Sequence, residues 1–241
     1  HMTEITHDLR PPLVVVVGKF NPAIFTDFWI ATELYEIRDG QEMQVTETTL
    51  ELPNGLLLTL TFLEGVGINF ADDKIQISLV DFEEATIAKA RTVLKNIFEK
   101  LPHTPVGAVG VNLRWFDGDP PQEVMDLFDT PEGFEAAFEL VERTHRIKIM
   151  EDGFVLNFSR HLTAGEAVFD FNYHRSVSSA DEIVDMLSDE FIQMEFAHSK
   201  QILEKFFSYD EFGALSFKDG VEKSEGEGNA EVHEAEIAKK A

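Results

Sequence analysis

The sequence predicts an α+β protein made of two similar lobes, each with the order strand, helix, antiparallel meander and long helix. Three observations lead to this fold class. Segments in which apolar and polar residues alternate, the period of a half-buried strand, occur in groups. Segments with apolar residues three and four positions apart, the period of a helix, separate these groups. The same order of elements occurs twice, so we expect lobes at 11–104 and 105–212, between a lead-in at 1–10 and a disordered acidic tail at 213–241.

The N-terminal lobe is expected to open with a strand at 13–20, where Leu and Val run together with little interruption. Such β-branched runs are typical of a strand that is covered on both faces. Asn21 and Pro22 then provide the cap and first turn of a helix that should extend to Ile37. Its buried side would carry Ile24, Phe28, Ala31 and Tyr35.

The first meander is expected to contain four strands, at 43–51, 56–63, 66–70 and 74–80. Pro53-Asn54-Gly55 predicts a tight turn between the first two of them. Asp81 and Glu84 have the spacing of a capping box, and they predict a helix that ends near Leu101. Because helices alternate with hairpins and not with single strands, a doubly wound parallel sheet is excluded.

The C-terminal lobe repeats this order. A strand at 106–116 is followed by a helical hairpin at 121–128 and 130–142, and then by a meander at 144–175. Ser178 or Ser179 is expected to cap one long helix at 180–207. His198 lies on the apolar side of that helix, and we interpret it as a hydrogen-bonded core residue. The two lobes either join into one extended sheet or pack back to back, with helices on one face.

Composition limits the classes of function. The chain has 241 residues, no Cys and a formal net charge of −25 at pH 7. This charge repels phosphate backbones and anionic lipids, so we expect neither general nucleic-acid binding nor membrane association. Disulfides and thiolate chemistry are excluded, and no apolar run has membrane-spanning length. We expect a cytoplasmic protein without a signal peptide, and we interpret His1-Met2 as a cloning remnant with the native start at Met2.

The meander at 144–175 carries the candidate functional residues, because its alternation sends polar side chains to one face. If its last two strands pair, two imidazoles, a carboxylate and several amides lie on that face. These groups would bind a divalent metal, perform acid–base catalysis, or form a plain solvent or interface face. We favour the interface and predict no cofactor, since the connecting loop would place the two histidines at different depths. The candidate residues are Arg146, Lys148, Asn157, Ser159, His161, Asp170, Asn172 and His174.

Charge is segregated in the second half of the chain, where acidic helices flank strands that are locally basic. The basic residues of these strands are Arg143, Arg146, Lys148, Arg160 and Arg175. They would receive an anionic ligand, receive the acidic face of another protomer, or neutralise the neighbouring helices, which we favour. No phosphate-binding glycine loop, nucleophile elbow or zinc-protease motif is present, so the usual signatures of an enzyme are missing.

Three short motifs stand out beside this pattern. They are Pro11-Pro12-Leu13-Val14, the segment Val109-Gly110-Val111-Asn112-Leu113-Arg114, and a closing strand with Asp170 before a helix that carries His198 and Phe206. With these motifs the chain resembles a sporadically distributed bacterial family of two-lobed α/β proteins of similar length, whose activity is not established. Trp115 departs from the family, which has Tyr-Asn after the Arg. The resemblance implies the two-lobed fold and a role in a bacterial accessory or defence system, and it assigns no catalytic residue.

The sequence therefore predicts a non-enzymatic protein-binding or assembly component that recognises a protein partner or a second copy of itself through the polar sheet face. One alternative is a metal- or nucleotide-dependent enzyme that uses His161, Asp170 and His174. A second alternative is an acidic DNA mimic, with Glu135, Glu139 and Glu142 along one side of a helix.

Overall fold

A single, mainly antiparallel sheet runs through the protein. The computed structural model describes residues 4–38, 41–42, 44–51, 57–128, 130, 133, 141–163, 165–214 and 217. Its eleven strands are β1 (Glu4–Asp8), β2 (Val14–Gly18), β3 (Val45–Glu51), β4 (Leu57–Leu63), β5 (Val66–Phe70), β6 (Lys74–Leu79), β7 (Val106–Asp117), β8 (Glu142–Glu151), β9 (Phe154–Thr163), β10 (Glu166–Ser176) and β11 (Glu211–Ala214). This confirms the mixed α+β class and its large antiparallel sheet.

The strand order is β3-β4-β5-β6-β2-β7-β10-β9-β8, so β2 and β7 meet in the middle. β7 is the longest strand, and β1 and β2 pair with successive parts of its same edge. β1 also pairs with β11, and this is the one parallel pair among the described strands. Of the two arrangements that the sequence left open, the molecule adopts the extended sheet.

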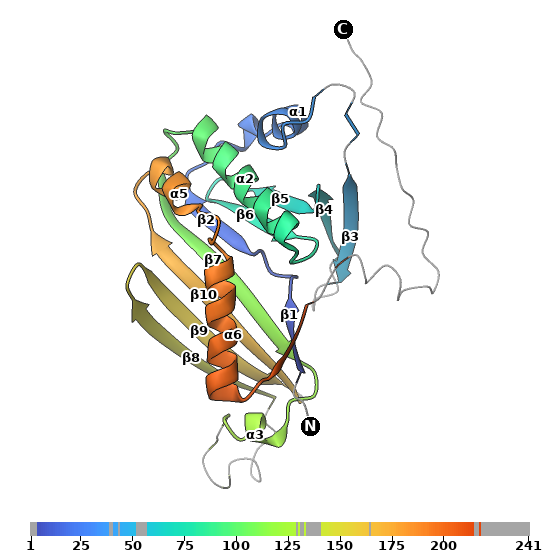
Figure 1. Ribbon diagram of the computed structural model, residues 1–241, viewed down its shortest axis with the longest axis vertical. Helices are drawn as coiled ribbons and strands as arrows, with labels where there is room; N and C mark the ends of the chain where they lie inside the picture. The colour runs from blue at the N-terminus through green and yellow to red at the C-terminus, as the bar shows by residue number, and fades with distance from the viewer. Residues whose placement is uncertain are drawn as a thin grey trace, which may run out of the picture.

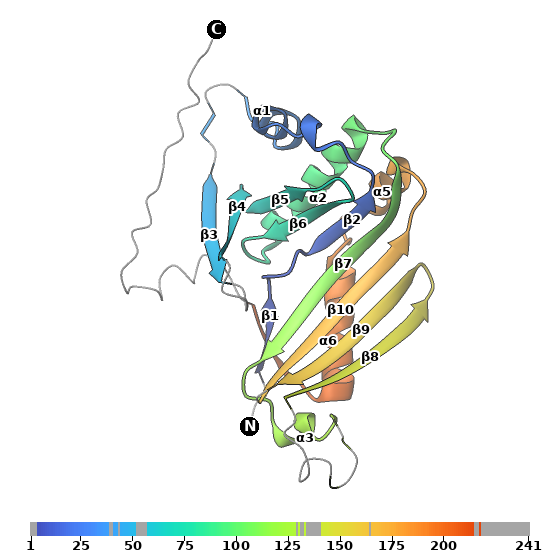
Figure 2. The ribbon, with the colours of Figure 1, turned by 180° about the vertical axis from the view of Figure 1, so that it is seen from behind.

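The helices lie on one face of this sheet. They are η1 (Pro22–Ile24), α1 (Asp27–Trp29), the π-helical turn η2 (Ile30–Leu34), α2 (Glu84–Lys100), α3 (Gln122–Met125), α5 (Ala180–Met186) and α6 (Gln193–Phe207). Figure 1 shows α2 and α6 in front of the strands, and Figure 2 shows the same strands from behind, where none of the described helices covers β7, β10, β9 or β8.

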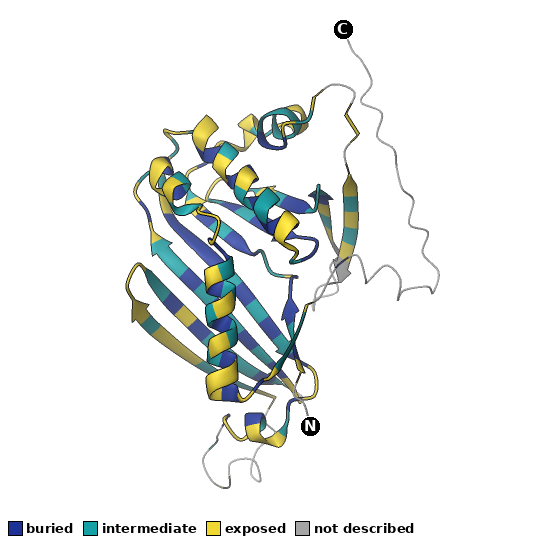
Figure 3. Cartoon of the chain, viewed as in Figure 1, coloured by how far each residue is buried: buried dark blue, intermediate teal, exposed yellow. Residues whose placement is uncertain are grey.

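The core fills the space between the sheet and these helices, and it continues across both halves of the chain. Val14 and Val16 of β2, Ile97 of α2 and Trp115 of β7 belong to one buried cluster. The indole nitrogen of Trp115 also donates to the Ser199 hydroxyl at 3.0 Å, which fixes α6 over β7. Figure 3 shows buried residues alternating with partly exposed ones along the strands behind α6.

The first predicted helix is broken into short pieces. The Asn21 side chain accepts from the Ala23 amide as expected, but Thr26 caps a second start by accepting from the Trp29 amide. A second capping residue only five positions after the first interrupts the series of backbone hydrogen bonds that a continuous helix would form. The predicted buried side is wrong at its N-terminal end, since Phe28 is 74% exposed. Tyr35 is buried as predicted, and its hydroxyl donates to the Val66 carbonyl at 2.8 Å.

The single long helix predicted at 180–207 is also wrong. Ser179 caps α5 as expected, but α5 ends at Met186 and α6 begins only at Gln193. Ile192, between the two helices, has a φ of 80°, and the Glu195 carboxylate accepts from its amide at 3.0 Å. The break therefore arises because Glu195, an acid within a helical pattern, holds the start of a new helix.

The predicted lead-in and tail both contribute strands. β1 belongs to the range expected to be a polar lead-in, and β11 crosses the predicted start of the tail at 213. Phe217 is buried against Leu9, Phe62 and Val80, and its amide donates to the Val80 carbonyl at 2.8 Å. The composition of the two chain ends did not indicate that their few apolar residues would be buried, and these contacts explain why the described residues of both ends are ordered.

Smaller differences concern β2 and the start of α2. β2 is covered on one face only, and Val17 on its other face is exposed, because no described helix lies there. The Asp81 carboxylate holds the start of α2 by accepting from the Glu83 amide and the Thr86 hydroxyl, with Glu83 as the cap. The predicted turn at 53–55, most of the predicted helix at 130–142 and the tail at 218–241 lie outside the described residues.

Candidate functional site

The candidate residues lie on the face of β7, β10, β9 and β8 that is opposite the helices, which we call the polar face. The strand register arranges its side chains in rows that cross all four strands, because directly opposed residues point to the same side. The first row contains Arg146, Ser159, Asp170 and Arg114, and the second contains Lys148, Asn157, Asn172 and Asn112. The period-two prediction of the two faces thus agrees with the strand register.

The second row is a chain of side-chain amides. Asn157 donates to Asn172 at 2.9 Å, Asn172 donates to Asn112 at 2.7 Å, and Asn112 donates to the Pro12 carbonyl at 3.1 Å. An added Cβ at Gly110 would lie 3.0 Å from the Asn172 amide nitrogen, so this row requires a small neighbour on β7. Each of the three amides donates to a partner within the protein, so their orientations are fixed before any ligand binds.

The first row contains an ion pair between β7 and β10. Arg114 Nε lies 2.6 Å from Asp170 Oδ1, and Arg114 Nη2 lies 3.4 Å from Asp170 Oδ2. Both side chains are partly exposed. This two-pronged geometry orients the carboxylate, and it occupies the group that would have to serve as a metal ligand or a general base.

His161 lies beside the first row, between carboxylates of two different strands. Its Nδ1 is 3.0 Å from the Thr144 hydroxyl and 3.4 Å from Glu142 Oε1. Its Nε2 is 3.2 Å from the Ser159 hydroxyl and 3.4 Å from Asp170 Oδ2. The Thr144 hydroxyl and then the His161 ring hold the pKa of Glu142 below its ordinary value. The two ring nitrogens contact acids on two different strands, so His161 links β8 to β10.

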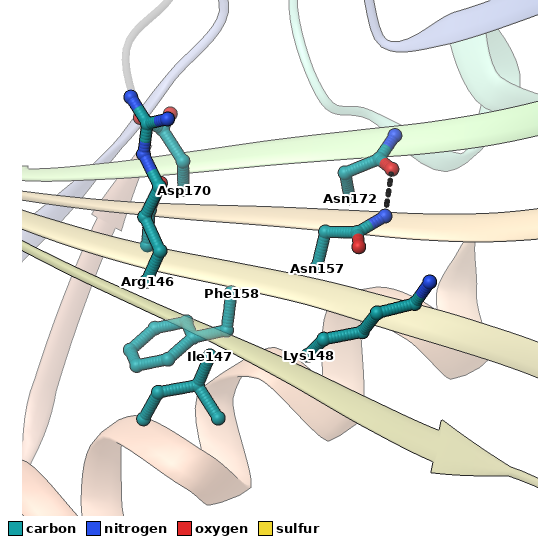
Figure 4. A pocket seen from close by; sticks show the side chains of 8 residues that line it. Arg146, Ile147, Lys148, Asn157, Phe158, Asp170 and Asn172 are labelled. Atoms are coloured by element: carbon teal, nitrogen blue, oxygen red, sulfur yellow. Dashed lines mark hydrogen bonds between the residues drawn. The ribbon is translucent and has the colours of Figure 1, made fainter.

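A hollow of about 380 Å³ lies over the two rows. Six of the eight candidate residues line it, namely Arg146, Lys148, Asn157, Ser159, Asp170 and Asn172. Figure 4 shows the side chains of Ile147 and Phe158 on the opposite side of the strands from these polar groups. These two residues therefore line the hollow with their backbone atoms. The hollow is thus an open depression lined mainly by polar and charged residues, with the cations Arg146 and Lys148 on its outer side.

The two candidate histidines do not meet. His161 is opposite Val168 of β10, whereas His174 lies six residues further along the same strand, opposite Val155 and Gly110. Six residues of a strand span about 20 Å, so no single ion or substrate atom contacts both rings. No group of three or more metal-binding side chains is found within the described residues.

The basic strands do not present one basic face. Arg160 lies on the helix side, with its guanidinium 5.1 Å from the Phe128 ring centre. Arg175 is on the same side, where it forms an ion pair with the buried Glu195. Arg175 therefore pairs with an acidic residue of a neighbouring helix, which is the arrangement that we favoured for the basic residues. Arg146 and Lys148 instead are exposed on β8.

Sequence reasoning missed four residues that complete the polar face. Asn112 and Arg114 extend the two rows onto β7, and Glu142 and Thr144 hold His161 from β8. The signal for the first two was present, since they alternate with buried residues in a strand that was predicted correctly. The pairing of β7 with β10, whose opposed residues are 50 to 68 positions apart, was not visible in the pattern.

Comparison of the chain with family models, with curated proteins and with solved structures finds no match. None of the helices in the described ranges combines the length and the apolar character that crossing a membrane requires.

Proposed function

We propose that this chain is a non-enzymatic, cytoplasmic binding or assembly protein that recognises a protein partner through the polar face. The observation that carries the proposal is that this face is ordered but uncovered. Its amide row and its Arg114–Asp170 pair are fixed by hydrogen bonds across β9, β10 and β7, although no described helix packs on them. A preorganised polar surface loses little conformational entropy on binding, which favours recognition of another surface.

The partner would offer acidic or amide groups to the hollow. Arg146 and Lys148 are exposed at its rim, and no hydrogen bond or salt bridge of either side chain is formed within the described part of the chain. Arg146 interacts with Glu142 only through electrostatic attraction and not through a hydrogen bond, so the N–H donors of Arg146 are available to a partner. Guanidinium and ammonium donors beside fixed amides match carboxylate and backbone carbonyl acceptors of a protein better than apolar groups.

The proposal includes an internal duplication of the two lobes at 11–104 and 105–212. Support comes from the strand order, in which the first strand of each half pairs with the last strand of its meander, β2 with β6 and β7 with β10. The first meander carries threonines instead, with Thr59 and Thr61 on one face of its strands and Thr46 and Thr48 on the other. The imidazole, carboxylate and guanidinium groups are specific to the second half, and recognition is therefore assigned to it.

The test is affinity capture of a tagged chain that is co-expressed with the products of its neighbouring genes. Asn157→Trp fills the hollow at an exposed strand position, where an aromatic side chain suits the sheet. Thr59→Trp makes the same change at an exposed position of β4 and serves as the matched control. We expect Asn157→Trp to lose the captured partner and Thr59→Trp to retain it, with both variants folded by circular dichroism. Equal capture by both variants contradicts the proposal.

The enzymatic alternative has less support. Asp170 is already held by Arg114, and His174 is distant from His161, so the three proposed catalytic groups do not share one site. The DNA-mimic alternative placed Glu135, Glu139 and Glu142 on one helix. Glu142 instead begins strand β8, and Glu135 and Glu139 lie outside the described residues.

A further inference from the structure

β8 is an edge strand of unusual length. It pairs with β9 along all ten of its residues, from Glu142 opposite Thr163 to Glu151 opposite Phe154. Its other edge has no partner strand among the residues that the structure describes, and it forms the outer border of the sheet in Figures 1 and 2. Alternate residues along this edge direct unpaired N–H and C=O groups outward, which is a template for another strand.

Apolar side chains are also exposed along this border. Ile147 is 50% exposed and Met150 is 72% exposed, and Val141 just before the strand is exposed as well. Proteins keep edges unpaired by making them short, bulged or charged. β8 is neither short nor bulged, since its register with β9 continues without a shift, and its charged residues include both signs, which a second strand can match.

We propose that β8 pairs antiparallel with β8 of a second copy of this chain, about a two-fold axis at His145, so that Glu142 of each copy faces Lys148 of the other. This inference rests on the assembly role proposed above and names the partner and the register. The polar faces of both copies would then lie on the same side, and their helices together on the other.

The faces of the strand limit the possible registers. Directly opposed residues share a face, so a two-fold axis must pass through a residue if polar side chains are to meet polar side chains. An axis between two residues would join the polar face of one copy to the helix-covered face of the other. The remaining choice is which residue of β8 lies on the axis.

Charge complementarity selects His145. An axis at Arg146 places that side chain opposite itself, and an axis at Ile147 places Arg146 opposite Lys148 twice. An axis at Thr144 pairs only five residues of the strand. With the axis at His145, seven residues pair, Thr144 faces Arg146, and Glu142 faces Lys148 at both ends. Like charges directly opposed are unfavourable and opposite charges are favourable, so this register is preferred.

The groups that form these pairs are available. The Lys148 side chain has no salt bridge with a described residue. The Glu142 side chain is 55% exposed, and its contacts with Thr144 and His161 both use Oε1, which leaves Oε2 for a partner. Seven paired residues with two ion pairs form a small interface, at the low end of the range for specific complexes, and we therefore expect a reversible dimer of micromolar affinity.

The experiment is a charge-reversal exchange, read by size-exclusion chromatography with light scattering and by sedimentation. The full chain is measured over a concentration series from about 1 µM to about 1 mM, a range that brackets micromolar affinity. Glu142→Lys and Lys148→Glu are each expected to weaken the dimer roughly tenfold, because each change turns two attractive pairs into two repulsive pairs. Lys95→Glu, at an exposed position on α2, makes the same charge change away from the interface and is expected to dimerise as the unaltered chain does.

The decisive sample is an equimolar mixture of the two single variants. There the Lys introduced at position 142 faces the native Lys148 only in homodimers, whereas in the heterodimer each end of the interface joins a Lys to a Glu. The mixture is expected to recover the affinity of the unaltered chain. A monomer at every concentration, a dimer that neither variant weakens, or a mixture without recovery overturns the inference. Partner capture that is lost with Asn157→Trp but accompanied by a monomer leaves the proposed function standing and removes this inference alone.

Discussion

Acidification should destabilise the fold through His7, which is buried in β1. Its side chain is 1% exposed and lies between the rings of Phe82, Trp115 and Phe196, at centroid distances of 4.7 to 5.2 Å. Its Nδ1 has no hydrogen-bond partner. Burial lowers the pKa of His7 from 6.5 to about 4, against a smaller opposing effect of the neighbouring Asp8. The folded protein therefore keeps this imidazole neutral where the unfolded chain would protonate it.

The sign and size of the effect follow from these two pKa values. Between pH 6.5 and about 4 the unfolded chain binds the proton and the folded chain does not, so stability falls as the pH falls through this window. Above pH 6.5 the group contributes no pH dependence. The pKa difference corresponds to about 3 kcal/mol of unfolding free energy over the whole window, since each tenfold change in proton affinity is worth about 1.4 kcal/mol.

The measurement is urea unfolding, followed by circular dichroism, at several pH values from 7.5 to 4.5. Carboxylates also titrate at the acidic end, so the quantity to compare is the difference in unfolding free energy between the native chain and His7→Phe. Phe keeps the aromatic packing and cannot take up a proton. His103→Phe, which removes an exposed imidazole, is the reference for loss of a histidine. We expect the native chain to lose about 2–3 kcal/mol relative to His7→Phe between pH 7 and 4.5. Parallel pH profiles for the two proteins would refute the reasoning.

Three further predictions concern the ion pairs and the amide row. Glu195→Gln should lower the free energy of unfolding by about 3 kcal/mol in thermal or urea melts, because it leaves the largely buried Arg175 guanidinium without its partner; a loss below 1 kcal/mol would contradict the assignment. Gly110→Ala should cost about 1 kcal/mol in the same assay, since its methyl group displaces the Asn172 amide, whereas Gly153→Ala on an open turn tests only backbone strain. Calorimetric titration with zinc should detect no binding at micromolar concentrations, because the described residues hold no group of three metal-binding side chains and Asp170 is already paired with Arg114; tight 1:1 binding would favour the enzymatic alternative.

Local pattern predicted the parts of the fold that local chemistry determines. The two faces of the second meander follow from the alternation of single residues, so Asn172 and Phe171 are on the expected sides. The caps at Asn21 and Ser179 are local as well, and each side chain accepts from a backbone amide two or three residues ahead.

The errors come from contacts between distant parts of the chain. The break between α5 and α6 depends on Glu195, whose partner Arg175 lies on β10, and no helical period contains that information. β1 was missed because His7 reads as a polar residue, yet it packs against rings from β7 and α6. The sequence predicted the residues that β8, β9 and β10 contribute to the hollow, but it did not predict Arg114, which joins them only because β7 pairs with β10.

The pairing of β2 with β7 has a consequence for how the protein unfolds. These two strands hydrogen-bond through the middle of the sheet, and one buried cluster extends to both sides of them. A cut in the connection between α2 and β7 would leave β2 paired only with β6 and would free the β2 edge of β7, so each fragment would expose one open strand edge and part of the shared core. We expect the two fragments to reassemble when they are mixed, as in a split-protein reporter. Loss of structure at either end of the sheet is therefore transmitted to the other end, and the chain should melt in a single cooperative transition.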